Sequence, residues 1–322
     1  MRHGKNGRYS ILITGGLGFL GSRLSTYLNN QEYDVTLGTS KERPDFPDSL
    51  GNFKKVFIDF FNSNKLIETL REYDCIIHLA SMDYSSSEQD PEKSLSIRGI
   101  GTLNLINAAI DSGIKYFLNF STTHVYGSNM SGNISEKKIP IPISQYAISH
   151  RLSEDLFIKK YLNGEINGAI FRLSNVVGLP KVRNNNCWKL FILDACEQAI
   201  KERKIFIKSS PNTQRDFIDI YTVLDAVNFF IKNNISSNNP VFNLASGKSL
   251  SLRTVSNLIS QRCEALFNFS PEVIFSTTEN HKNKKFKFDV DKINQFIRTS
   301  DEKKLLESID EILIFFKSKF VN

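Results

Sequence analysis

The sequence predicts an α/β fold in which a doubly wound parallel sheet is covered by helices. Short apolar runs alternate with segments of helical periodicity through the first half of the chain. The runs are continuously apolar, as in strands that are buried on both faces of a parallel sheet. A glycine-rich turn directly follows the first run. This order of elements argues for a doubly wound domain.

The first part of the chain contains the regular elements. The predicted strands are SILIT (10–14), DVTLG (34–38), KVFID (55–59), CIIHLA (75–80), YFLNFS (116–121) and GAIFRLS (168–174). The predicted helices between them span Gly18–Asn29, Ser63–Glu72, Thr102–Ser112 and Tyr146–Leu162. Each helix follows one strand and precedes the next, as a βαβ alternation requires.

The pattern loosens after Val176. A helix is predicted over 187–204, followed by a short strand, KIFIK. The run VFNLAS (241–246) reads as a buried strand that is able to rejoin the first sheet. A final helix is predicted from about Asp301 to Lys317, where Thr299 and Glu302 have the spacing of a capping box.

A chain of 322 residues exceeds the size at which one hydrophobic core usually stops growing, so two lobes are expected. The larger lobe comprises residues 1–176 plus about 217–246. The smaller, C-terminal α/β lobe comprises about 177–216 and 247–322. We expect the smaller lobe to lie over the carboxyl ends of the strands.

The bulk composition excludes several classes of protein. With 40% hydrophobic and 23% charged residues, the chain has the composition of a soluble globular protein. Its longest apolar runs are too short to span a bilayer, and no secretory signal is read at the N-terminus. The four cysteines lie far apart without any C-x-x-C, which indicates reduced, buried thiols in the cytoplasm and no metal site. They are Cys75, Cys187, Cys196 and Cys263.

The charge balance is mildly basic. The formal net charge of +7 is compatible with phosphate-bearing ligands or weak attraction to nucleic acid. The densest basic run, HKNKKFKF at 281–288, reads as a solvated loop leading into a strand. No nucleic-acid partner is therefore expected.

The turn after the first strand is a candidate phosphate cradle. In ILITGGLGFLGSRL, Gly15 permits a tight turn and Gly18 allows backbone N–H groups to approach a pyrophosphate. Gly21 permits close packing of the following helix on the strand. The helix N-terminus, which includes Phe19 and Leu20, then faces the anion with its partial positive charge. This context predicts a dinucleotide-binding turn.

The identity of the dinucleotide depends on the end of the second strand. A carboxylate there would bind the ribose hydroxyls of NAD, but the position holds Thr39, followed by Ser40, Lys41 and Arg43. Hydroxyls and cations suit a 2′-phosphate, so NADP is slightly favoured over NAD. The alternative is a basic surface loop beside bound NAD. Asp59, at the end of the third strand, is a candidate contact to the adenine.

Five further motifs point to a family. HLAS (78–81), STTHVYG (121–127), YAISH (146–150), FRLSNV (171–176) and QRDFI (214–218) follow the glycine turn in order. With these motifs the chain resembles the extended short-chain dehydrogenase/reductases, specifically the NAD-dependent epimerase/dehydratase group that acts on nucleotide sugars. The resemblance covers nearly the whole chain and implies a Rossmann-like sheet for NAD or NADP. The cofactor-binding residues that it implies are Gly15, Gly18, Phe19, Leu20, Gly21, Thr39, Ser40, Lys41, Asp59, Phe60, Leu79, Ala80, Ser81, Tyr146 and His150.

The resemblance also implies a catalytic triad. Thr122 would be its hydroxyl member and Tyr146 its acid/base, whereas the usual lysine four residues later is His150. A lysine there holds the nicotinamide ribose and lowers the pKa of the phenol by its charge. A neutral imidazole can donate one hydrogen bond to the ribose, but its charge is partial at neutral pH. Arg151 could add a permanent field, although neighbouring residues point to different helix faces.

Three interpretations of His150 stay open at this point. The first is a working triad in which the histidine is a substituted third member. The second is a slowed or specialised enzyme with a tightly held cofactor. The third is a binding protein that has lost turnover.

The resemblance implies a substrate site as well. Thr123 and His124 stand where the 4,6-dehydratases of the family carry an acidic pair, so a dehydratase mechanism loses support. His124 either lines the pocket or replaces one of those acids. Asn175 would face the nucleotide sugar, and Arg215 would grip its diphosphate.

Two further positions complete this comparison. The alternative for Arg215 is a surface ion pair with Asp216. Arg98 stands where the family usually has asparagine, and Arg172 reads as a structural strand residue.

The resulting hypothesis is an NAD(P)-dependent nucleotide-sugar epimerase or oxidoreductase. Hydride transfer is expected at sugar C4 with Tyr146 as acid/base, and epimerase is favoured over reductase. The alternatives are an NADPH-dependent 4-keto-sugar-nucleotide reductase and a catalytically silent NAD(P)- or RNA-binding member of the fold. A cytoplasmic homodimer is expected from the resemblance, without a membrane partner.

Overall fold

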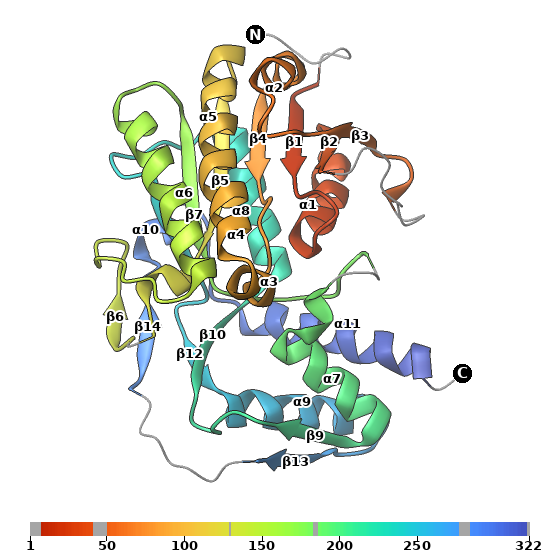
Figure 1. The fold of residues 1–322 in the computed structure, drawn as a ribbon. Coiled ribbons are helices and arrows are strands. Elements are labelled where there is room, and N and C mark those ends of the chain that lie inside the picture. Colours follow the sequence, from red (N-terminus) through yellow and green to blue (C-terminus); the bar gives the residue numbers. More distant parts are fainter. Residues whose placement is uncertain (1–7, 41–49, 129, 183–185, 277–283, 321–322) are drawn as a thin grey trace.

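A computed structural model describes residues 8–40, 50–128, 130–182, 186–276 and 284–320. Its centre is a parallel sheet of seven strands in the order β11-β7-β5-β4-β1-β2-β3 (Figure 1). The order reverses between β1 and β4, which places the switch point of the sheet beside the glycine turn. The predicted Rossmann-like sheet is confirmed. Its strands are β1 (Ser10–Thr14), β2 (Asp34–Thr39), β3 (Lys54–Phe57), β4 (Cys75–His78), β5 (Tyr116–Thr122), β7 (Gly168–Leu173) and β11 (Val241–Leu244).

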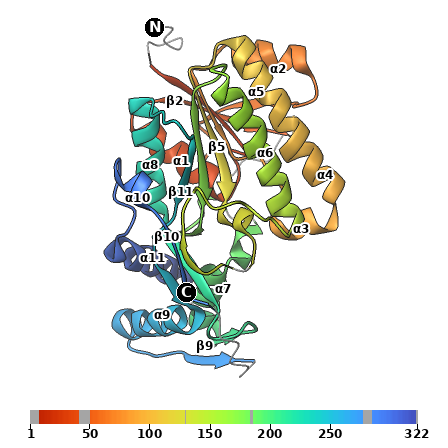
Figure 2. The same cartoon turned by 90° about the vertical axis from the view of Figure 1, so that its left-hand side faces the viewer.

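Helices cover both faces of this sheet (Figure 2). One face carries α2 (Ser63–Leu70), α5 (Gly101–Ser112) and α6 (Gln145–Leu162), which pack Leu66, Leu105 and Phe157 into a shared apolar cluster. The other face carries α1 (Phe19–Asn30) and α8 (Ile220–Asn233). Burial on both faces explains why β1, β4 and β5 read as unbroken apolar runs. β11 rejoins the sheet beside β7, as VFNLAS allowed.

The segment before α5 contains helices that the sequence patterns did not predict. They are α3 (Tyr84–Gln89), α4 (Pro91–Leu95) and the π-helical turn η2 (Ser96–Ile100), which runs directly into α5. Asp83 caps α3 and Asp90 caps α4, each by accepting a hydrogen bond from a backbone N–H three residues later. The predicted helix start at Thr102 is therefore the middle of a longer helical stretch.

A second group of elements lies beyond the carboxyl ends of the strands (Figure 1). It forms its own apolar cluster, which includes Cys196, Ile259 and Phe316. Its helices and strands are α7 (Phe191–Glu202), β9 (Lys204–Ile207), α9 (Leu252–Phe267), β13 (Glu272–Phe275) and α11 (Glu302–Phe320). The predicted domain boundaries stay a prediction; the one near residue 217 falls inside β10 (Gln214–Asp219).

Two small sheets join these layers. β12 (Ser249–Ser251), β10 and β8 (Asn175–Val177) form one, and β6 (Gly132–Ile134) pairs in parallel with β14 (Phe286–Phe288) in the other. The short elements η3 (Thr123–Tyr126), η4 (Asn186–Lys189) and α10 (Asp291–Asn294) complete the described chain. None of the helices in the described ranges is long and apolar enough to cross a membrane.

The predicted capping box before α11 is wrong. The Thr299 hydroxyl donates to Asn294, whereas the Asp301 carboxylate accepts from the backbone N–H groups of Lys303 and Lys304. A carboxylate is a strong cap because it also complements the helix dipole. The predicted burial of the four cysteines is confirmed.

Candidate functional site

The glycine turn between β1 and α1 is closely packed against its own backbone and β4. Gly15 has a φ of +70°, and a Cβ there would lie 2.9 Å from the backbone nitrogen of Ala80. A Cβ on Gly21 would lie 2.5 Å from the Gly15 carbonyl oxygen and 2.8 Å from the Cα of Gly16. Because these neighbours are backbone atoms, neither position accommodates a side chain without movement of the turn.

The Gly18 side of the same turn is less crowded. A Cβ on Gly18 would meet only the Gly15 carbonyl oxygen, at 3.1 Å. Gly18 is the N-cap of α1 and brings no side-chain cap, so the first amides of the helix, including those of Phe19 and Leu20, keep capacity for an anion. These uncapped backbone donors at a helix N-terminus suit a dinucleotide pyrophosphate.

The residues predicted to bind the adenosine half lie at the ends of β2 and β3. Thr39 ends β2 partly buried and Ser40 is exposed, whereas Lys41 and Arg43 lie outside the described residues. The Asp59 carboxylate accepts a hydrogen bond of 2.9 Å from the backbone N–H of Phe61. The preference for NADP over NAD stays a prediction.

The motif HLAS connects the glycine turn to the predicted triad. Leu79 donates its backbone N–H to Thr14 at 3.2 Å, which holds the end of β4 beside β1. Two residues later, Ser81 Oγ lies 3.1 Å from His150 Nε2. Phe60 packs edge-on against the ring of His78, with 5.8 Å between centroids. Ala80, between these residues, contacts the turn at Gly15.

His78 itself is a structural residue. Its Nδ1 lies 2.7 Å from Thr14 Oγ1, and its Nε2 lies 2.9 Å from Thr102 Oγ1. The ring thus links β1, β4 and α5. Burial, reinforced by the charge of Arg98, lowers the pKa of His78 well below its usual value, so the ring is neutral at physiological pH.

The structure brings Thr122, Tyr146 and His150 together. Ser144 caps α6 through the Ala147 N–H, so the tyrosine enters on the first turn and the histidine follows one turn later. Their ring centroids are 4.5 Å apart. Burial raises the pKa of the Tyr146 phenol, while the Arg98 charge and a hydrogen bond with the Thr122 side chain lower it.

His150 does not reproduce the charge of a lysine. It is buried, and burial together with the Arg98 charge lowers the pKa of its imidazole well below the usual value. The ring is therefore neutral at neutral pH. Its Nδ1 finds no hydrogen-bond partner within the described part of the chain, although the Phe120 carbonyl lies close enough to raise the pKa slightly.

Arg98 is a site residue whose contacts sequence reasoning missed. It is fully buried in η2 and donates to the Ala80 carbonyl at 3.2 Å, to Asn119 Oδ1 at 2.7 Å and to the Phe120 carbonyl. Burial lowers its pKa to about 10, which leaves the guanidinium charged at neutral pH. The available signal was the pair of departures from the family pattern, an arginine gained at 98 and a lysine lost at 150.

The cation that the sequence suggested, Arg151, is already paired. Its guanidinium contacts Asp155 and, at 3.1 Å, Glu154. Glu154 also forms a buried ion pair of 2.7 Å with Arg172, which matches the structural role expected for that strand residue. Arg151 therefore does not provide an uncompensated field for the phenol.

The predicted substrate residues lie at the carboxyl edge of β5 and in the small sheet beyond it. Thr123 is buried, whereas His124 is exposed with its ring centroid 6.2 Å from that of Tyr146. Asn175 donates to the Asp216 backbone carbonyl at 2.8 Å.

Arg215 is partly buried over the ring of Phe191, with its guanidinium carbon 5.7 Å from the ring centroid. Burial lowers its pKa, and its charge in turn helps to lower the pKa of His124. Asp216 is instead bound by Ser174 and Ser246, so the alternative ion pair between Arg215 and Asp216 is not formed.

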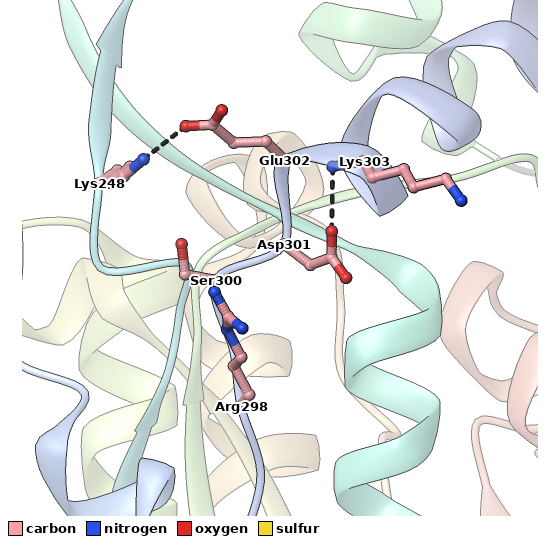
Figure 3. Close-up of a pocket in the computed structure, with 6 residues that line it drawn as sticks. All are labelled: Lys248, Arg298, Ser300, Asp301, Glu302 and Lys303. Atoms are coloured by element: carbon pink, nitrogen blue, oxygen red, sulfur yellow. Dashed lines mark hydrogen bonds and ion pairs between the residues drawn. The ribbon is translucent and has the colours of Figure 1, made fainter.

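A cavity of about 390 Å³ lies elsewhere, at the start of α11. Lys248 and Glu302 point toward each other across it, and Asp301 turns back to the Lys303 backbone (Figure 3). Its lining contains none of the predicted site residues. Across the described ranges, no cluster of three or more His, Cys, Asp or Glu side chains is suited to a metal ion.

Comparisons with known proteins identify related sequences and folds. The model of the NAD dependent epimerase/dehydratase family matches residues 11–245. A GDP-6-deoxy-D-mannose reductase of Pseudomonas aeruginosa is 26% identical over 262 residues, covering 78% of this chain and 79% of the relative. A probable UDP-arabinose 4-epimerase of Arabidopsis thaliana is 23% identical over 271 residues, covering 76% of this chain and 66% of the relative.

The similarity extends to solved structures. The UDP-N-acetylglucosamine 4-epimerase from Methanobrevibacter ruminantium M1, in complex with UDP-N-acetylmuramic acid, superposes with a TM-score of 0.81 at 22% identity. That match covers 97% of this chain and 99% of the other. At this identity the likeness shows the fold, and the family model adds membership. The chain belongs to the NAD dependent epimerase/dehydratase family.

Proposed function

We propose that the protein is an NAD(P)-dependent epimerase that acts on a nucleotide sugar, with hydride transfer at C4 and Tyr146 as acid/base. The observation that carries the proposal is the cluster at the start of α6. The ring centroids of Tyr146 and His150 lie 4.5 Å apart, and Ser81 Oγ lies 3.1 Å from His150 Nε2, next to Ala80, which packs on the glycine turn. A phenol beside a dinucleotide is an arrangement for moving a proton while hydride leaves carbon.

The chain offers groups that would hold the pyrophosphate and the nicotinamide ribose of the cofactor. The amides at the start of α1 and the turn at Gly15 and Gly18 would bind the pyrophosphate. Ser81 and His150, whose Oγ and Nε2 lie 3.1 Å apart, would face the nicotinamide ribose. A bound nicotinamide dinucleotide supplies the acceptor, and then the donor, of the hydride.

The proton step belongs to Tyr146. As phenolate, it takes the proton of the C4 hydroxyl while hydrogen leaves C4 as hydride, so that the C4 carbinol becomes a carbonyl. The Thr122 hydroxyl donates to the same oxygen and stabilises the charge on it. Return of hydride to the opposite face of C4, with the proton given back by Tyr146, yields the epimer.

Asn175 and Arg215 would position the substrate. A planar guanidinium at the end of the site suits the diphosphate of a nucleotide sugar, because it donates two parallel hydrogen bonds. Thr123 and His124 would line the sugar pocket beside the phenol. The absence of an acidic pair at these two positions argues against a 4,6-dehydratase.

The main competing function is reduction of a 4-keto nucleotide sugar by NADPH. The similarity to a GDP-6-deoxy-D-mannose reductase and the hydroxyl at Thr39 favour it. A silent NAD(P)- or RNA-binding member is the third candidate, supported by the loss of lysine at position 150.

Labelled cofactor separates the three functions. The purified protein is incubated with 4-deuterated NADH or NADPH and UDP-, dTDP-, GDP- or CDP-sugars, or their 4-keto derivatives. An epimerase interconverts sugar pairs with no net consumption of cofactor, whereas a reductase oxidises NADPH in proportion to product. Cofactor binding without any conversion across this set contradicts the enzymatic proposal. A homodimer in the cytoplasm remains part of the proposal, and light scattering of the purified protein measures its oligomeric state.

A further inference from the structure

Two departures from the family pattern lie in elements that pack around the Tyr146 phenol. Position 150 has lost a cation to histidine, and position 98 has gained a guanidinium. The first lies on α6 and the second in η2, elements that are separated in sequence but packed against each other. The guanidinium gained at position 98 is therefore placed to compensate for the cation lost at position 150.

Arg98 is held rigidly beneath the site. Its two terminal nitrogens donate to the Ala80 carbonyl, which follows β4, and to Asn119 and Phe120 in β5. Asn119 is in turn fixed by Ser153 of α6, at 3.0 Å. The guanidinium thus lies between two sheet strands and the helix that carries the phenol, with no exposure to solvent.

Arg98 forms no ion pair with any of the described residues. All its hydrogen-bond acceptors are neutral carbonyl or amide oxygens, and no carboxylate of the described residues lies within ion-pair distance of it. By contrast, Arg172 and Arg151 are both paired with Glu154. A buried charge without a counter-ion acts over a longer range than a paired one, because little solvent screens it.

The groups around it leave Arg98 as the cation that acts on Tyr146. The histidines nearest to Arg98, which are His78 and His150, are neutral. The negative charge of Asp83 acts in the opposite direction to Arg98, because it raises the pKa of the Tyr146 phenol. The titratable and charged groups that face this centre from the packed elements are His78, Asp83, His124, Tyr146, His150, Glu154 and Arg215.

We propose that Arg98 is a positioning residue that supplies, from η2, the permanent positive charge that a lysine on α6 would otherwise supply to Tyr146. Two roles of the usual lysine are then carried by different residues. His150 and Ser81 hydrogen-bond the ribose, and the positive charge of Arg98 stabilises the phenolate. The inference deepens the proposed function and rests on it for its catalytic meaning. Its physical content, the ionisation of one phenol, is measurable without any substrate.

The test is a pH titration of Tyr146 by NMR on protein labelled with ζ-carbon ¹³C tyrosine. Tyr146→Phe identifies the signal by its disappearance. In Arg98→Met the midpoint of the Tyr146 titration is expected to rise by about one pH unit or more, since an opposite charge nearby lowers a pKa by that order. Arg98→Lys, which keeps the charge, is expected to retain a midpoint closer to the native one.

Two variants keep the test decisive if Arg98→Met fails to fold. His150→Gln preserves hydrogen bonding without a titratable ring, and it is expected to leave the midpoint of Tyr146 nearly unchanged. Arg98→Asn combined with His150→Lys moves the cation back to α6, and it is expected to bring the midpoint back toward the native value. Arg151→Gln removes the paired neighbouring cation and serves as the matched control, with no expected change.

The proposal is overturned if a folded Arg98→Met protein, verified by circular dichroism, titrates at Tyr146 as the native protein does. It is equally overturned if His150→Gln raises the midpoint of the Tyr146 titration by about one pH unit or more, the rise that is expected for Arg98→Met. Because no sugar is present in these measurements, a failure of the proposed epimerase activity leaves their outcome unaffected. If turnover is found, Arg98→Met should also move the ascending limb of the kcat profile to higher pH.

Discussion

The imidazole of His150 and the hydroxyl of Ser81 lie 3.1 Å apart, which ties α6 to the segment that follows β4. This hydrogen bond uses Nε2 and leaves Nδ1 without a partner within the described ranges. A lysine in the same place could make a similar contact, but it would bring a charge next to Arg98. The consequences of that difference can be measured.

Substitution of His150 by lysine should harm the protein. Two cations would share a buried site in which Arg98 has no ion-pair partner among the described residues, and like charges disfavour each other in a low dielectric. We expect a lower melting temperature and, where activity exists, a lower kcat. Adding Arg98→Asn to the same protein should recover part of both. Activity that arises only in His150→Lys would instead mark the histidine as a loss of catalysis.

The three glycines of the turn should respond differently to alanine. At Gly21 the new Cβ would collide with backbone, so Gly21→Ala should lose about 1–3 kcal/mol of stability through overpacking. At Gly18 the Cβ would meet one backbone atom, the Gly15 carbonyl oxygen at 3.1 Å, so Gly18→Ala should lose less stability than Gly21→Ala but bind dinucleotide at least tenfold more weakly. Calorimetry and cofactor titration measure the two effects. Undiminished cofactor binding by Gly18→Ala would argue against a phosphate cradle here.

Glu154 should be a major determinant of stability. Its carboxylate is fully buried between Arg172 and Arg151, and Glu154→Gln leaves the buried Arg172 charge unpaired. Breaking a buried ion pair costs about 3–5 kcal/mol, so urea unfolding should show a loss of that order. Asp155→Asn, at a half-exposed partner of Arg151, is the control and should change the unfolding free energy by under about 1 kcal/mol.

The pH profile should report a phenol and no imidazole. Because burial raises the pKa of Tyr146, the free enzyme holds little phenolate at pH 7, and kcat/KM should rise with pH by about tenfold per unit below that pKa. The pKa of His150 is depressed, so the ring stays neutral from about pH 6.5 upward and adds no inflection there. A plateau that begins below pH 7 would contradict this assignment.

Arg215→Met should weaken substrate binding. Loss of a charge-assisted contact to a diphosphate is worth about 1.5–3 kcal/mol, so KM for the nucleotide sugar should rise at least tenfold with a smaller effect on kcat. Arg253, which stacks on Phe275 at 5.0 Å, provides a matched arginine outside the predicted site. Arg253→Met should leave KM unchanged. A drop in kcat alone for Arg215→Met would place the residue in the chemical step instead.

The sequence predicted the sheet and the glycine turn well, because both depend on local signals. Unbroken apolar runs identify β1, β4 and β5, and the spacing of Gly15, Gly18 and Gly21 is fixed by close backbone contacts. The convergence of Thr122 and Tyr146 followed from family motifs rather than from periodicity. The strands and the glycine turn were predictable because each is specified within a few residues.

Other features depend on contacts between distant segments. The stretch from Tyr84 to Ile100 is polar and shows no clear apolar period, so α3, α4 and η2 were missed. Asp301 replaced Thr299 as a cap because the Thr299 hydroxyl is engaged by Asn294. The environment of Arg98 could not be read from its neighbours in sequence, since its partners come from β4 and β5.

The wide turn η2 has a consequence for how this protein tolerates change. A π-helical turn holds one more residue per hydrogen-bonded loop than an α-helical turn, so it offsets everything after it by one position. Deletion of a single residue between Ser96 and Ile100 would allow an unbroken α-helix yet rotate Arg98 away from Ala80 and Asn119. The protein would keep its fold, but the Arg98 guanidinium would no longer point toward the same partners. The number of residues in η2 therefore determines the position of this buried charge.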